Sequence, residues 1–138
     1  MQRNDMVEKR RVYIDGVEIP GFVYAGELKR EKGRVDVPEF KKKRKIQDGI
    51  TTYPEYELRY KISRDTSTLK FFRNWFDDNE NHDVTIIRTD AHGSEFERVL
   101  LSSCECIDHT IPEADLSSPT YAQVTVIIAP WEITPIDI

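Results

Sequence analysis

The sequence predicts a mainly β fold: two packed antiparallel sheets, as a sandwich or barrel, with one flanking α-helix. Residues 55–63 alternate without a break between apolar and charged side chains, as a strand with one dry and one wet face does. Helical spacing of apolar residues occurs over residues 65–77. The other regular segments look extended and are mostly joined by short turns. Strands and helices do not alternate, which argues against a doubly wound parallel sheet.

The strand at 55–63 has two chemically different faces. Its apolar face carries Tyr56, Leu58, Tyr60 and Ile62, and its charged face carries Glu55, Glu57, Arg59 and Lys61. A charged face of this kind is common on a solvated antiparallel sheet. A small sheet also has open edges that invite pairing with other chains. If copies paired through those edges into a ring, the charged face could line a central channel.

The helix predicted within 65–77 is amphipathic. Leu69, Phe72 and Phe76 recur at helical spacing, with Phe71 and Trp75 at the edges of the same stripe. Asp65, Thr66 or Ser67 can cap its first free N–H groups. We therefore expect the helix to contribute these residues to the core: Leu69, Phe72, Trp75 and Phe76.

The rest of the chain predicts one domain over residues 1–138, large enough for a single core. Residues 1–9 form a polar N-terminal arm, and residues 130–138 form a short C-terminal tail with apolar anchors. Asp15-Gly16 lies between alternating flanks and predicts a hairpin over 11–19, because both residues tolerate positive φ. The remaining strands are expected at 82–89, 94–101, 102–109 and 120–129.

Residues 29–49 differ from their surroundings. They are rich in Lys and Arg and show little alternation, and Pro38 restricts them further, so we expect a long basic loop. Its most prominent side chains are Arg34, Asp36, Lys41, Lys42, Lys43, Arg44 and Lys45. Five successive cations can bind nucleic-acid phosphates. However, only Phe40 is adjacent for base stacking, so docking on an acidic protein surface is favoured.

Composition limits the possible partners and compartments. The formal net charge of −5 argues against nucleic-acid binding by the whole surface. No stretch approaches the roughly 20 apolar residues of a membrane span, so no membrane anchoring is expected. The first ten residues lack the apolar core of a signal peptide, and assembly in a cytosol is expected. Cys104 and Cys106 are read as two small, reduced hydrophobic residues.

No motif points to catalysis. His82, Asp83, Asp90 and His92 could gather near one turn, but their spacing matches no standard metal-ligand pattern. The sequence also lacks a Gly-rich phosphate loop and a nucleophile elbow. We therefore expect a protein that is not an enzyme and needs no metal or cofactor.

Several segments, taken in order, carry a resemblance to a known family. They are the hairpin at 11–19, the basic segment at 29–49, the strand and helix within 56–76, the strand and turn at 82–93, and the ending at 118–130. Together they resemble the tail tube proteins of contractile-tailed bacteriophages and related phage-tail-like particles. The order and length of the elements carry the match, which covers nearly the whole chain.

The resemblance implies hexameric rings that stack into a hollow tube inside a contractile sheath, with partners in the sheath, baseplate and tail terminator. It implies a tube that conducts DNA from capsid to host without binding it specifically. It places the protein in the virion, and in the host cytoplasm during assembly. Glu55, Glu57, Arg59 and Lys61 become candidates for the lumen. The type VI secretion tube shares the architecture, so a tube subunit of a secretion system or tail-like particle stays open.

The resemblance also gives the basic segment a role. Residues 29–49 become a loop that reaches neighbouring subunits and the next ring, and the N-terminal arm and C-terminal tail become further contacts between subunits. Asp77, Asp78 and Glu80 after the helix are candidates for its acidic receiving surface. The alternative from another class is a small nucleic-acid-binding β-barrel that uses Lys41–Lys45.

Overall fold

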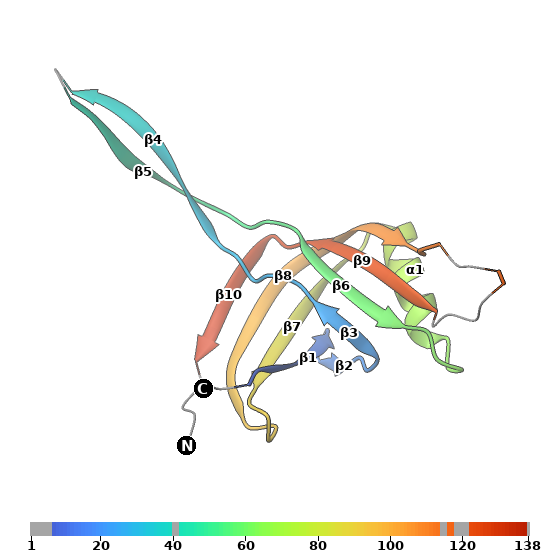
Figure 1. Ribbon diagram of the computed structural model, residues 1–138. Helices are drawn as coiled ribbons and strands as arrows, with labels where there is room; N and C mark the ends of the chain where they lie inside the picture. The colour runs from blue at the N-terminus through green and yellow to red at the C-terminus, as the bar shows by residue number, and fades with distance from the viewer. Residues whose placement is uncertain (1–6, 40–41, 114–115, 118–121, 138) are drawn as a thin grey trace.

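The fold is built on one eight-stranded antiparallel β-sheet, from which a two-stranded hairpin projects (Figure 1). The structure is a computed structural model. It describes residues 7–39, 42–113, 116–117 and 122–137, and only the backbone at 33–39, 42–52 and 137. The elements are β1 (Lys9–Ile14), β2 (Val17–Glu18), β3 (Phe22–Ala25), β4 (Glu31–Glu39), β5 (Lys42–Thr52), β6 (Tyr56–Lys61), α1 (Ser67–Asp78), β7 (Asn81–Thr89), β8 (Glu95–Thr110), β9 (Gln123–Ala129) and β10 (Glu132–Asp137).

The main sheet folds into two layers because β8 belongs to both. Its strand order is β2-β1-β7-β8-β9-β6-β3, and β10 also pairs with β8. The first half of β8 lies between β7 and β10, whereas its second half pairs with β9. Between the halves, Ser103 adopts a positive φ of 47°, and its N–H donates to Asp83 Oδ1 at 2.9 Å. The predicted sandwich is therefore present, as two layers of one continuous sheet.

We call these the β1 layer (β2, β1, β7, the first half of β8, and β10) and the β6 layer (β3, β6, β9 and the second half of β8). The inner faces of the two layers form one core. Alternate residues of each strand point inward, as the period of two requires. The core cluster combines Val12, Ile14, Val84, Ile86, Val99, Leu101 and Ile133 from the β1 layer with Tyr56, Leu58, Tyr60, Cys106, Val124, Val126 and Ile128 from the β6 layer.

The hairpin predicted at 11–19 is confirmed. β1 and β2 pair with Ile14 opposite Val17. The two turn residues, Asp15 and Gly16, have φ of 50° and 82°, as a type I′ turn requires. Asp15 also ties this turn to β7, since its N–H donates to the carbonyl oxygen of Asp83 at 2.9 Å.

The helix is present, but one of its predicted core residues is not in the core. Phe72 and Trp75 are buried, and Leu69 and Phe71 are partly buried against the core. Phe76 is 43% exposed, so its assignment to the core was wrong. The buried arc is centred between Phe72 and Trp75, which turns Phe76 to its edge. At the start of α1, Asp65 Oδ1 accepts a hydrogen bond from the N–H of Ser67 at 3.0 Å.

Aromatic rings fix α1 to the sheet. Phe72 stacks on Tyr60 of β6, with ring centroids 5.1 Å apart, and meets Phe22 of β3 edge to face at 6.0 Å. Trp75 meets His82 of β7 at 4.9 Å and donates its indole N–H to the carbonyl oxygen of Glu80 at 2.7 Å. The helix therefore contacts strands of both layers and plugs one end of the core.

Three predicted segments take a different form. The expected loop at 29–49 is largely the hairpin of β4 and β5, which extends away from the body (Figure 1). Its register places Asp36 opposite Lys45, so oppositely charged residues stand at facing positions and favour the pairing. The expected tail at 130–138 contains β10, because Ile133 continues the apolar alternation. The strands expected at 94–101 and 102–109 are one strand, β8, bent at Ser103.

The start of β1 and the end of β10 lie at the same end of the body (Figure 1). Among the described residues, no helix has both the length and the apolar character that crossing a membrane requires.

The burial difference between Phe72 and Phe76 makes a stability prediction for the lone subunit. Phe72→Ala leaves a cavity inside the core and should cost about 3–5 kcal/mol. Phe76→Ala should cost less than about 1 kcal/mol, because this ring is largely solvated. Urea unfolding of the monomer measures both. Equal losses in the two variants would contradict the exposed position of Phe76.

Candidate functional site

The β6 layer ends in two unpaired strand edges. On one side, β3 pairs with β6 and with no other strand of the described residues. On the other side, residues 106–110 of β8 pair with β9, while β7 pairs with β8 only as far as Glu105. Each edge presents backbone N–H and C=O groups that can hydrogen-bond a further strand.

Strand direction makes these two edges compatible with each other. All pairs along the path β3-β6-β9-β8 are antiparallel, and the layer has four strands. The two edge strands therefore run in opposite directions. If one copy is placed beside another, β3 of the first and β8 of the second meet antiparallel, which continues the ladder without a break.

The outward face of β6 carries the charged row predicted from the sequence. Arg59 pairs with Glu57 on the same strand, with Nη2 and Oε2 3.0 Å apart, and its guanidinium lies 4.4 Å from the ring centre of Tyr24. Glu55 and Lys61 are exposed beside this pair. With two acids and two bases, the row has no net formal charge. The ion pair lies within one strand.

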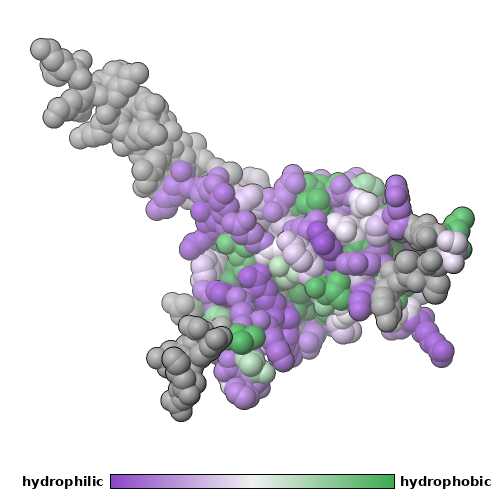
Figure 2. Space-filling model, viewed as in Figure 1, coloured by the Kyte–Doolittle hydropathy of each residue, from purple (hydrophilic) through white to green (hydrophobic). Residues whose placement is uncertain are grey.

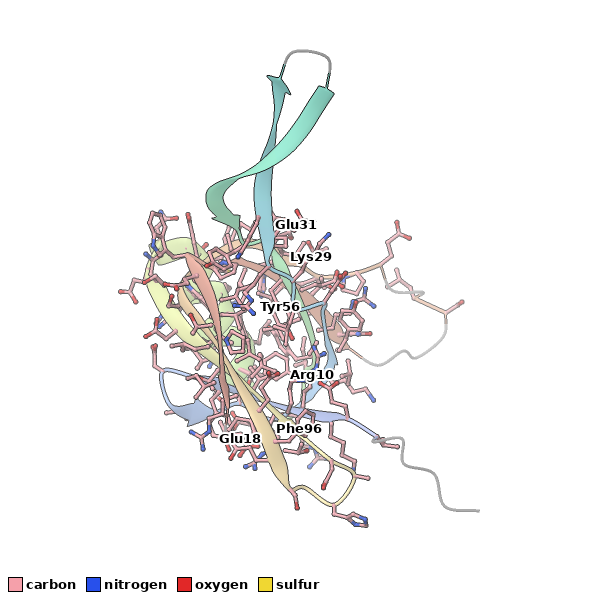
Figure 3. All side chains as sticks on the ribbon, turned by 90° about the vertical axis from the view of Figure 1, so that its left-hand side faces the viewer. Arg10, Glu18, Lys29, Glu31, Tyr56 and Phe96 are labelled. Carbon is pink, nitrogen blue, oxygen red and sulfur yellow. The ribbon has the colours of Figure 1, made fainter. Side chains whose placement is uncertain are left out.

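A charged network closes the core at the end away from α1. Arg10 of β1 reaches across to the β6 layer, donating to the carbonyl oxygen of Gly26 at 2.7 Å and to the hydroxyl of Tyr56 at 3.3 Å (Figure 3). Its Nε also lies 2.7 Å from Glu8 Oε1. Glu8 is shared with Arg88, whose Nε lies 2.8 Å away.

This network was missed by sequence reasoning, because its members are far apart in the chain. Arg88 also contacts Glu97 of β8. Arg10, Arg88 and Glu97 stand opposite one another across three strands, on the row that follows the apolar core. The alternation of Glu8, Arg10 and Val12 was the only local signal.

The charges in this network shift the ionisation of its members. Hydrogen bonds from Arg88 and Arg10, with their positive charges, outweigh partial burial and lower the pKa of Glu8 to about 2. The hydrogen bonds that Arg88 donates to Glu8 and Glu97 raise the pKa of Arg88. Both groups therefore stay charged near neutral pH, and the network links the N-terminal segment to the sheet.

Two grooves lie on either side of Arg10. The first, about 300 Å³, runs between β1 and β3 and is lined by Glu8, Arg10, Val12 and residues 22–25. The second, about 360 Å³, lies between residues 27–30 and the β1 layer, and Arg10, Arg30 and Arg88 line it together with Leu28 and Ile133. Both open the core to its surroundings on the β3 side. The visible surface of the body otherwise mixes polar and apolar residues (Figure 2).

The predicted metal candidates have other contacts. His82 Nδ1 lies 2.5 Å from Asp15 Oδ2, and Asp83 accepts from Ser103. Asp90 holds its own turn by accepting from the N–H groups of His92 and Ser94, both at 2.9 Å. Among the described residues, no three such side chains gather in a way that could hold a metal ion.

Both cysteines are buried free thiols, as expected from the sequence. Burial raises the pKa of Cys104 to about 12 and that of Cys106 to about 11. The predicted contact residues of the hairpin lie outside the described side chains: Lys41 is outside the described residues, and Arg34, Asp36 and Lys42–Lys45 are described by backbone only.

No family model matches the sequence, and no curated protein matches it significantly. Among solved structures, the fold is similar to a chain in the tube-terminating cap of the anti-feeding prophage: TM-score 0.83, 17% identity, 100% of this chain and 94% of that chain covered. A chain in the sheath/tube terminator of the extracellular contractile injection system PVC is also similar, with a TM-score of 0.81, 18% identity and 98% of both chains covered. Hcp1 from Flavobacterium johnsoniae has a TM-score of 0.61 and 10% identity, with 93% of this chain and 98% of that chain covered. These similarities confirm the predicted fold, that of contractile tail tube proteins.

The low pKa of Glu8 makes a prediction about acid stability. Because its folded pKa lies below the ordinary value of 4.5, Glu8 contributes stability above pH 4.5 that is lost as the pH falls toward 2. Glu8→Gln should cost about 1 kcal/mol at pH 7, after allowance for solvent screening, and almost nothing near pH 2. Thermal melts across this pH range test it. A cost that does not change with pH would contradict the ion-pair assignment.

Proposed function

We propose that this chain is a tube or tube-terminator subunit of a contractile injection particle. The observation that carries the proposal is the β6 layer, whose two unpaired edges run in opposite directions and can join copy to copy. The fold similarity to chains of sheath/tube terminator and tube-cap assemblies, over nearly the full length of both partners, supports it.

In the proposed assembly, β3 of each subunit pairs with residues 106–110 of the next subunit. Each copy adds four strands to one continuous barrel, and six copies close the ring, the number that the family resemblance implies. The β1 layer then faces outward, toward a sheath. Stacked rings, joined by the β4–β5 hairpin, make the tube, and baseplate and terminator proteins bind its ends.

The outward face of the β6 layer lines the lumen in this arrangement. Glu55, Glu57, Arg59 and Lys61 give that lining polar side chains without net charge. Such a wall neither attracts nor repels a polyanion strongly, because its charges cancel over short distances. This suits a conduit for DNA, which must pass without being held. It suits other cargo of a secretion-type particle equally well.

Assembly of the purified protein is the direct test. Light scattering and negative-stain electron microscopy should show rings or tubes. A protein that stays monomeric at all concentrations, and binds DNA with strong salt dependence, would overturn the proposal in favour of a nucleic-acid-binding barrel.

Charges placed on the two edges should block ring closure. Val23 of β3 and Ile107 of β8 are 47% and 38% exposed, so Val23→Lys and Ile107→Lys should leave the monomer folded. Each should reduce rings strongly, because a lysine on an edge strand opposes pairing with another strand. Val17→Lys, on β2 outside this layer, is the control and should leave ring formation intact. Normal rings from both edge variants would contradict the pairing scheme.

The basic hairpin should be needed for stacking. Reversing the charges at Lys41–Lys45 to Glu should allow single rings but block tube growth, if the hairpin docks on an acidic surface of the next ring. Exchanging the four lysines of this run for Arg keeps the charge and should preserve tubes. Tube lengths in electron micrographs measure the effect, and tubes of normal length from the Glu variant would rule out the charge-based docking.

A further inference from the structure

In a single subunit, the last turn of α1 exposes an aromatic ring and carries two carboxylates without a basic residue. Phe76 is 43% exposed, while Phe72 and Trp75 on the same helix are buried. Asp77 and Asp78 follow it, and this turn contains no basic residue. The C-terminal end of a helix carries partial negative charge, so two carboxylates there are unfavourable unless a cation lies nearby.

The grooves beside Arg10 combine apolar side chains with basic and acidic ones. The groove between β1 and β3 has an apolar wall that includes Val12, Phe22 and Val23. Arg10 lines this groove and the neighbouring one, where Arg30, Glu27 and Glu97 also lie. Arg10 and Arg88 are already paired with Glu8 and Glu97, so Arg30 is the basic group of interest. Arg30 makes no ion pair with the described residues, so a carboxylate from another molecule could join it.

These two surfaces lie at opposite edges of the β6 layer. Helix α1 packs against β8, and its residues Arg73 and Asp77 are close enough to His109 of β8 to influence the pKa of that imidazole. The grooves lie beside β3 and the residues that follow it. When β8 of one copy pairs with β3 of the next, the end of α1 is brought to the grooves of that next copy.

We propose that Phe76, with Asp77 and Asp78, forms a plug that enters the groove beside Arg10 in the neighbouring copy of this chain. The ring becomes buried against Val23, and the carboxylates meet Arg30. The inference rests on the proposed ring and adds a side-chain lock to its backbone pairing. It also accounts for the apolar stripe of α1, which is wider than the core of one subunit requires.

The first test compares two serine variants of matched exposure. Phe76→Ser should raise the concentration for half-maximal ring formation by about tenfold or more, as loss of a central interface aromatic does. Ile136→Ser, on β10 of the β1 layer, removes another apolar side chain that is 43% exposed and should leave that concentration unchanged. Monomer melting temperatures should stay near the wild-type value in both. Equal ring formation by the two variants would overturn the plug.

The second test uses charge exchange to identify the partner surface. Asp77→Lys with Asp78→Lys should weaken rings, and adding Arg30→Glu should restore part of the loss, because the reversed pair attracts again. If ring formation by the Asp77→Lys, Asp78→Lys variant is instead restored by replacing Lys42–Lys45 with Glu, the two acids bind the basic hairpin. That result would overturn the inference.

A cross-link gives a readout that does not depend on affinity. The double variant Phe76→Cys, Val23→Cys should form a disulfide ladder of oligomers under mild oxidation, while each single variant should not. Both native thiols are buried and should not interfere. Rings seen by microscopy without the ladder would overturn the plug and leave the proposed function standing. Absence of rings in the unmodified protein would overturn both.

Discussion

The bend of β8 at Ser103 is the constraint on which the rest of the fold depends. One strand supplies both layers, so the direction in which its second half leaves the bend sets the packing of the whole β6 layer on the β1 layer. The backbone N–H at the bend is held by the carboxylate of Asp83, whose backbone also hydrogen-bonds Asp15 in the β1–β2 turn. A side chain that looked like a candidate ligand in the sequence thus has a structural function.

The bend also explains why residues 106–110 of β8 form an edge of the β6 layer. β7 pairs with β8 only up to Glu105, and α1 packs against β8. Residues 106–110 therefore lack a strand on that side among the described residues, while β3 lacks one at the other end of the layer. Soluble proteins usually protect such edges. Their presence at the two ends of one layer gives the proposed ring its geometry.

The sequence pattern predicted those elements that are determined by residues close together in the chain. The alternation around Leu58, the turn at Asp15-Gly16 and the aromatic spacing in α1 each fix a short piece of structure by period or by positive φ, and all three are present. Phe76 was misplaced because helical period gives a stripe but not its width. Arg10 and Arg88 were missed because only strand pairing brings them together. The β4–β5 hairpin was expected to be a loop because Lys and Arg dominate its sequence and its apolar alternation, at Val35 and Val37, is short. The lumen and contact residues remain predictions, since a single copy cannot test them.

The positions of the chain ends have a practical consequence. β1 starts and β10 finishes at the same end of the body, so a short linker could join them without crossing the sheet (Figure 1). The natural order of strands is then only one of several possible. A circularly permuted chain, opened at the exposed Gly93 turn, would keep every strand pair of the main sheet. The new ends would lie just beyond Arg88 and Glu97, at the same end of the sheet as the charged network around Arg10.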